Sequence, residues 1–171
     1  MKFVYQNGLM NGTSSTTFSP DGTTSRGMIV TILWRMAGSP DMKDEIFGYP
    51  FQDVDANAYY ATAVYRARMN GIADGYGDNT FGPDKPITRE QMAVMLYRYA
   101  QHKGYDTTKG GMAIREYADY GQISSYALEA MDWANATGIV SGTSERLLSP
   151  QGQATRAQAA AMLMRFCEQY A

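Results

Sequence analysis

Apolar residues recur along the chain with the period of an amphipathic α-helix. Two stripes at i, i+3, i+4 and i+7 are rich in alanine, which indicates helices that approach a neighbour closely. Three other stripes carry larger side chains and predict a second kind of helix that also buries one face. The stripes are Tyr60, Ala63, Val64 and Ala67; Ala127, Ala130, Met131 and Ala134; Met28, Ile29, Ile32, Leu33 and Met36; Met92, Met95, Leu96 and Tyr99; and Ala159, Met162, Leu163 and Phe166. This pattern predicts a mainly α fold.

Polar residues mark where these helices begin. Thr88 with Gln91, and Thr155 with Gln158, match a capping box, in which each side chain satisfies an unpaired backbone N–H group. The stretch from Asp74 to Phe81 is rich in Gly, Asp and Asn and predicts turns between two helices. Each unit is therefore predicted to be a helix, a glycine-bounded loop and a second helix.

The same marks occur three times. Gly8 to Gly12 recurs as Gly71 to Gly75 and as Gly138 to Gly142, at offsets of 63 and 67 residues. The loop triplets and the arginines keep these offsets: Phe18-Ser19-Pro20, Phe81-Gly82-Pro83 and Leu148-Ser149-Pro150; Arg26, Arg89 and Arg156; Arg35, Arg98 and Arg165. Several marks at two shared offsets indicate one structural unit used three times.

We therefore expect one module over residues 1–171, made of repeats at about 1–40, 50–104 and 112–171, with polar connectors at Gly38 to Pro50 and Gln101 to Gly111. The first repeat is partial, because aligning Gly8 on Gly71 leaves no counterpart of Phe51 to Ala63. Met1 to Gly12 lacks the charged and apolar regions of a secretory signal peptide. The helices are expected to form a pseudo-threefold spindle around a central helical bundle.

Composition excludes several classes. A net charge of −2 and 44% hydrophobic residues are those of an ordinary globular protein, and they argue against a broad nucleic-acid surface. No apolar run approaches the roughly 20 residues of a membrane span. The single His102 and single Cys167 exclude a His-based metal cluster and an internal disulfide. No nucleophile–base pair stands out, so we predict no catalytic residues, no metal site and no cofactor.

The combination of motifs resembles the S-layer homology (SLH) domain family. The resemblance spans nearly the whole chain and rests mainly on the second copy: Phe51-Gln52-Asp53-Val54, Tyr59-Tyr60-Ala61, Gly71-Ile72-Ala73-Asp74-Gly75-Tyr76, Phe81-Gly82-Pro83 and Ile87-Thr88-Arg89-Glu90-Gln91. It implies non-covalent anchoring of an exported protein at a bacterial cell surface. The implied ligand is a secondary cell wall polysaccharide that commonly bears pyruvylated N-acetylmannosamine, and the implied sites are grooves between neighbouring repeats.

The resemblance implies a set of carbohydrate-binding residues. A guanidinium can pair with the ketal carboxylate, and the N–H groups expected to be free at a helix start also favour an anion. Tyrosines offer platforms for sugar rings, and glycines allow close approach of the ligand. The predicted site residues are Arg89, Arg156, Arg26, Asp53, Asp119, Tyr59, Tyr126, Gly75 and Gly142. Met28, Gln91 and Gln158 replace the family's usual glutamate, and repeat 1 lacks counterparts of Asp53 and Tyr59.

Structural roles compete with these ligand roles. A structural arginine would bridge a carboxylate or a helix C-terminus to hold its repeat. Asp53 and Asp119 are equally suited to cap the first helix of their repeat or to form a turn there. Two functional alternatives also stay open. One is a protein-interaction module in which a partner chain completes repeat 1, and the other is an accessory module of a larger wall-active enzyme.

Overall fold

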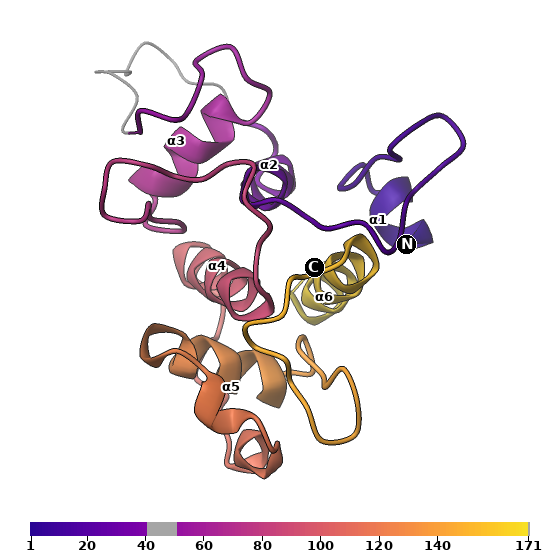
Figure 1. Cartoon of the computed structure of the whole chain (residues 1–171), viewed down its shortest axis with the longest axis vertical. Helices are drawn as coiled ribbons and strands as arrows, with labels where there is room; N and C mark the ends of the chain where they lie inside the picture. The colour runs from indigo at the N-terminus through magenta and orange to yellow at the C-terminus, as the bar shows by residue number, and fades with distance from the viewer. Residues whose placement is uncertain (41–50, 171) are drawn as a thin grey trace.

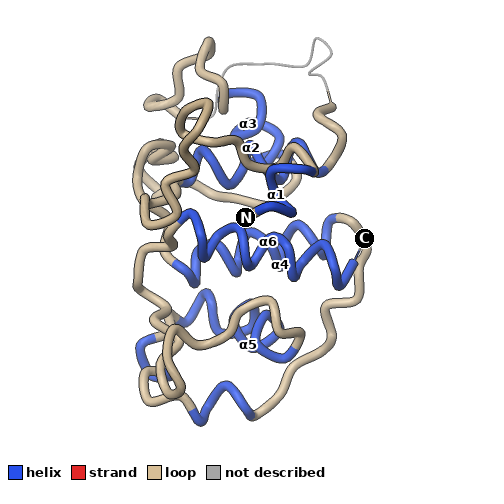
Figure 2. Tube along the Cα trace, turned by 90° about the vertical axis from the view of Figure 1, so that its right-hand side faces the viewer, coloured by secondary structure: helices blue, strands red, loops and turns tan. Residues whose placement is uncertain are grey.

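A computed structural model describes residues 1–40 and 51–170. Helices joined by loops make up this part of the chain, and the only β pairing in it consists of isolated bridges (Figure 2). The α-helices are α1 Lys2–Gln6, α2 Arg26–Met36, α3 Ala61–Met69, α4 Arg89–His102, α5 Leu128–Ala136 and α6 Arg156–Tyr170, with short 3-10 helices at Ala113–Glu116, Tyr120–Gln122 and Ser125–Ala127. The prediction of a mainly α fold is confirmed, whereas the predicted connector Gly38 to Pro50 lies mostly outside the described residues.

The helices form where the apolar stripes predicted them. The alanine-rich stripes bury the inner faces of α3 and α5, and the larger stripes bury α2, α4 and α6. Thr88 and Gln91 make both hydrogen bonds of a capping box at the start of α4. Thr155 and Gln158 make the same pair of bonds at the start of α6. Both capping predictions are therefore confirmed.

Each first helix packs on the second helix of the preceding repeat. Helix α3 lies against α2, α5 against α4 and α1 against α6, while α2, α4 and α6 gather at the centre (Figure 1). The last of these contacts joins the N-terminal helix to the C-terminal one, so the three repeats close into a cycle. Because α1 has five residues and α3 and α5 have nine, the first repeat has the shortest outer helix.

A ring of backbone hydrogen bonds joins the segments that precede the three central helices. Thr24 N donates to Ala154 O at 3.1 Å, Ala154 N to Ile87 O at 2.9 Å, and Ile87 N to Thr24 O at 2.9 Å. All three residues are fully buried. Ring closure requires one residue from each repeat, so these hydrogen bonds link all three repeats to one another.

Candidate functional site

Each repeated arginine clamps the loop of the next repeat in the cycle. Arg26 donates from Nε to Phe81 O at 3.0 Å and from Nη2 to Asp74 O at 2.7 Å. Arg89 and Arg156 make the same two bonds, Arg89 to Leu148 O and Ser141 O, and Arg156 to Phe18 O and Asn11 O. A planar guanidinium suits this task because its donors diverge in a fixed fork. The structural role considered for these arginines was a bridge to a carboxylate or a helix C-terminus, whereas their observed partners are loop carbonyl oxygens of the next repeat.

Two of the three clamping arginines, Arg26 and Arg156, also lie over aromatic rings. The guanidinium of Arg26 is 4.8 Å from the Tyr76 ring centre and 4.7 Å from that of Phe81, and Arg156 is 4.6 Å from Phe18. Burial lowers the pKa of each arginine, and the charge of Arg165 lowers the pKa of Arg89 further. Arginine stays charged throughout the physiological range, so these sites keep a positive charge beneath the loops.

The repeated aspartates hold the same loops from the opposite side. The Asp53 carboxylate accepts from Phe81 N at 2.8 Å and Gly82 N at 2.7 Å. Asp119 accepts from Leu148 N at 2.9 Å and Ser149 N at 2.7 Å. Of the two structural roles considered for them, the helix cap is wrong, because the N-cap residues of α3 and α5 are Tyr60 and Ala127. The carboxylates satisfy loop amides instead.

The expected free N–H groups at the helix starts are also absent from the described structure. The first two amides of each central helix donate to carbonyl oxygens of a neighbouring repeat: for α4, Arg89 N to Gly152 O and Glu90 N to Pro150 O. The third amide is taken by the side-chain cap. The prediction was wrong because the sequence does not show that a neighbouring loop supplies these acceptors. Any anion here must be bound by side chains.

Two concave sites lie between repeats, at positions related by the repeat offsets. The larger, which we call the Arg26 groove, has a volume of about 360 Å³. The smaller, the Arg156 groove, has a volume of about 170 Å³. The Arg26 groove is lined by Arg26, Ile72 to Tyr76, Gln91, Val94, Met95, Arg98 and Tyr126, and the Arg156 groove by Leu9 to Gly12, Met28, Thr31, Ile32, Arg35, Tyr59 and Arg156. Each groove thus combines one loop, one central helix, a clamping arginine and a tyrosine.

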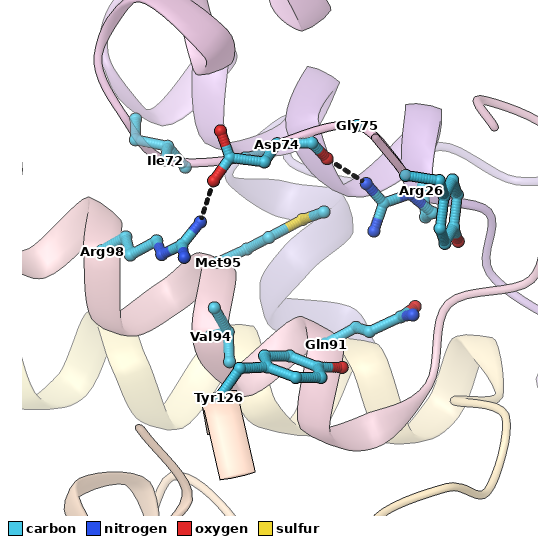
Figure 3. Close-up of a pocket in the computed structure, with 11 residues that line it drawn as sticks. Arg26, Ile72, Asp74, Gly75, Gln91, Val94, Met95, Arg98 and Tyr126 are labelled. Atoms are coloured by element: carbon cyan, nitrogen blue, oxygen red, sulfur yellow. Dashed lines mark hydrogen bonds and ion pairs between the residues drawn. The ribbon is translucent and has the colours of Figure 1, made fainter. Parts of the chain in front are cut away.

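Charge and geometry in the Arg26 groove favour an anion. In Figure 3, Asp74 lies between two arginines, with its backbone carbonyl bonded to Arg26 and its carboxylate to Arg98. The carboxylate also pairs with Arg68 at 2.6 Å and with Arg98 at 2.9 Å, and all three side chains are at least a third exposed. Two guanidinium groups therefore share one carboxylate while a third, that of Arg26, binds the backbone carbonyl, and the rim of the groove keeps a positive charge.

The predicted tyrosines form one wall of each groove. Tyr126 is 56% exposed and Tyr59 is 60% exposed, so each presents a ring to solvent. Burial of part of the side chain and the neighbouring Glu90 raise the pKa of Tyr126 to about 12. Burial is also the main cause of the raised pKa of Tyr59. Tyr126 lines the Arg26 groove and Tyr59 the Arg156 groove.

The remaining predicted residues, Gly75, Gly142 and Arg89, differ in their position relative to the two grooves. Gly75 lines the Arg26 groove, and a Cβ there would lie 2.5 Å from the Phe51 ring. A Cβ at Gly142 would lie 2.9 Å from the Tyr117 ring. These glycines therefore make room for an aromatic ring of their own repeat. Arg89 occupies the third inter-repeat position, where residues 1–40 supply no counterpart of Tyr59 or Tyr126.

Some groove residues were not predicted. Arg35 and Arg98 were not among the predicted site residues. Arg98 pairs with Asp74 and Arg35 donates to Leu9 O at 3.4 Å, and both also line the grooves. Their recurrence at the repeat offsets was the sequence signal that could have marked them as groove residues. Gln91 was named as a capping residue and as a replacement of the family's usual glutamate but not as a site residue, yet it also lines the Arg26 groove. Among the described residues, no group of three His, Cys, Asp or Glu side chains could hold a metal ion.

Comparison with known sequences decides the family. A profile of the S-layer homology domain matches residues 1–27, 50–93 and 116–160, which together make up more than half of the chain. The chain belongs to the S-layer homology domain family. The three matched segments coincide with the three repeats, and the first is the shortest, as the sequence predicted.

Relatives of this SLH module are much longer proteins. It is 32% identical over 169 residues to an endoglucanase of Bacillus sp. (strain KSM-635), covering 95% of this chain and 17% of that protein. It is 27% identical to the surface-layer 125 kDa protein of Lysinibacillus sphaericus, covering 94% of this chain and 13% of that protein. The cellulosome-anchoring protein of Acetivibrio thermocellus is 24% identical, covering 88% of this chain and 33% of that protein.

The coverage bears on what the module does. It spans a third or less of each of these relatives, so in the endoglucanase the matching region is an accessory part of the protein. Proteins with surface-layer, anchoring and enzyme names share it, which supports a cell-surface anchoring module rather than a catalytic domain. Within residues 1–40 and 51–170, no helix is long and apolar enough to cross a membrane.

Proposed function

We propose that this SLH module attaches a longer exported protein to the bacterial cell wall by binding an anionic secondary cell wall polysaccharide in the Arg26 and Arg156 grooves. A pyruvylated N-acetylmannosamine unit fits the chemistry, because its ketal carboxylate matches the guanidinium groups and its ring matches the tyrosine wall. The observation that carries the proposal is the repetition of this arrangement at positions related by the repeat offsets.

Two grooves on one module would also strengthen attachment to a polymer. A polysaccharide presents many copies of its anionic unit, so binding in one groove raises the effective concentration of units at the other. Each groove can then bind weakly while the module as a whole stays attached. Repetition of a binding site suits this task, whereas a catalytic centre is needed only once.

The test is a sedimentation assay on purified cell walls, with and without removal of the polysaccharide by hydrofluoric acid. The proposal predicts that the module sediments with intact walls and stays in solution with stripped walls. Equal binding to both would refute the polysaccharide as ligand. A Y59A/Y126A variant supplies the site control, because both side chains are exposed and their loss leaves the arginine and aspartate clamps in place.

A second candidate rests on the short first helix. A cleft of about 350 Å³ lies beside α1 and the end of α6, lined in part by Phe3, Phe166 and Tyr170. The corresponding space between α3 and α2 has a volume of about 30 Å³. A partner chain that completes repeat 1 would occupy this cleft. Light scattering tests it: a mass that rises with protein concentration supports self-association, and a constant monomer mass at high concentration argues against it.

A further inference from the structure

One position breaks the threefold repeat beside the Arg26 groove. The residue after the clamping arginine is Gly27 in repeat 1, Glu90 in repeat 2 and Ala157 in repeat 3. A second break lies after the groove tyrosines, where Tyr59 is followed by Tyr60 and Tyr126 by Ala127. The two breaks face each other in space, because α3 packs on α2 and α5 packs on α4.

The two breaks compensate each other in size. A Cβ on Gly27 would lie 3.1 Å from the Tyr60 ring, so that ring takes the space of a side chain at this position. At the equivalent interface Ala127 carries only a methyl group, and Glu90 extends from α4 instead. One interface thus uses a glycine and a tyrosine where the other uses a glutamate and an alanine.

Glu90 is 1% exposed, and its carboxylate is satisfied entirely by repeat 3. It accepts from Ser124 N at 3.0 Å and Ser124 Oγ at 2.8 Å. It also accepts from Tyr126 Oη at 3.0 Å and Gln151 Nε2 at 2.9 Å. A buried carboxylate is costly unless such donors surround it. Four donors fix its position, and the carboxylate in turn fixes the hydroxyl of Tyr126.

Tyr59 has a different anchor. Its ring meets Tyr60 edge to face, with centroids 5.0 Å apart at 72°. Glycine at position 27 leaves no carboxylate there to receive the Tyr59 hydroxyl. The tyrosine walls of the two grooves are therefore held differently. Tyr126 has a charge-assisted hydrogen bond to the buried Glu90, whereas Tyr59 has ring packing and a neutral side-chain hydrogen bond with Ser25.

We propose that Glu90 is a positioning residue that fixes Tyr126 as the wall of the Arg26 groove, making this groove the pre-organised and tighter of the two sites for an anionic saccharide. The statement about affinity rests on the proposed function, whereas the statement about Tyr126 does not. Glu90 does not line the groove itself and acts through the tyrosine. Pre-organisation strengthens binding because a fixed side chain loses no further freedom when the ligand arrives.

The first test needs no ligand. NMR of selectively ¹³C-labelled tyrosine reports the ring order and the pKa of Tyr126, with its signal assigned by Y126F. In E90Q we expect a less ordered ring and a pKa that falls from about 12 toward the ordinary value of about 10. E129Q is the matched control, since Glu129 accepts from Tyr97 Oη at 2.8 Å at the same α4–α5 interface. An unchanged Tyr126 in E90Q would overturn the proposal.

The second test measures affinity for the methyl glycoside of pyruvylated N-acetylmannosamine. In a Y59A background, which removes the wall of the Arg156 groove, E90Q should weaken binding roughly three- to tenfold, the cost of ordering one side chain. E129Q should not weaken it. E90G/A127Y, which carries the residue pair found at Gly27 and Tyr60, serves as a second variant if E90Q does not fold, and it should weaken binding similarly. An unchanged affinity in these variants would overturn the proposal.

The two tests separate the two claims. If the wild-type module does not bind the glycoside, the proposed function fails, and the NMR experiment still decides whether Glu90 fixes Tyr126. If the wild type binds and E90Q loosens Tyr126 without any loss of affinity, Glu90 does fix Tyr126, but the claim that this makes the Arg26 groove the tighter site is refuted and the proposed function stands.

Discussion

Replacing Asp119 by asparagine tests whether one carboxylate holds the loop of a complete repeat. Asp119 is 5% exposed and accepts from two backbone amides, Leu148 N and Ser149 N. Asparagine offers one acceptor oxygen and places an NH₂ group against the other amide. One amide therefore loses its partner in a buried setting.

The magnitude follows from these two bonds. An unsatisfied buried N–H group costs about 1–3 kcal/mol, and exchanging the second charge-assisted bond for a neutral one costs about 1 kcal/mol more. We expect D119N to lower the free energy of unfolding by about 3 kcal/mol. For a chain of this length each kcal/mol shifts Tm by about 2–4 °C, which gives a decrease of about 6–12 °C.

Asp53 provides an internal comparison, because its carboxylate makes the same two bonds but the residue is exposed. Water can replace a lost acceptor at an exposed site, so D53N should cost only about 1 kcal/mol. The exposed Asp21, whose replacement removes no such clamp, serves as a surface control in D21N. Calorimetry of the three variants checks the expected order of the Tm decreases, which is largest for D119N, smaller for D53N and smallest for D21N. If D119N and D53N lower Tm equally, or if D119N has no effect, the clamp account is refuted.

Three further changes test other parts of the account. Thr24 Oγ1 is buried without a hydrogen-bond partner, so T24V should raise the free energy of unfolding by about 1 kcal/mol; a lower Tm in calorimetry would show that the hydroxyl has a partner. The pKa of Tyr126 is about 12 in the folded state and about 10 in an unfolded chain. Between pH 10 and pH 12 the folded state therefore keeps a proton that the unfolded state loses, so the free energy of unfolding falls as pH rises from about 10 to about 12. Y126F removes this contribution. In urea titrations from pH 9 to 12 its free energy of unfolding should fall less steeply with pH than that of the wild type, and an identical decrease in both proteins would contradict the prediction. Y59A and Y126A should each weaken wall binding, and Y59A/Y126A more than either, because two grooves share the polymer; wild-type sedimentation of Y59A/Y126A would exclude the tyrosine walls.

Much of the fold could be predicted because the same local helix and capping signals occur in each of the three repeats. The stripe of Met92, Met95 and Leu96 on α4 and the capping box of Thr88 and Gln91 depend only on residues within one helix. The short first repeat was also visible from the offsets. These features are set by helix period and by side chains that lie three or four positions apart.

The partners of the site residues could not be predicted. Arg26 and Asp53 recur at the right positions, but nothing local shows that both bind the Phe81 loop. The helix-start amides looked free because their acceptors belong to another repeat. The role we propose for Glu90 was hidden for the opposite reason, since it breaks the repeat on which the prediction relied. Contacts between repeats depend on how the three repeats pack against one another.

The most direct test of the central claim is a crystal structure of the module with the methyl glycoside of pyruvylated N-acetylmannosamine. The account predicts the sugar ring against Tyr126 in the Arg26 groove, with the ketal carboxylate about 2.7–2.9 Å from a guanidinium nitrogen of Arg26 or Arg98. A second molecule should lie against Tyr59. A sugar bound only in the cleft beside α1 and α6, with both grooves empty, would contradict the account.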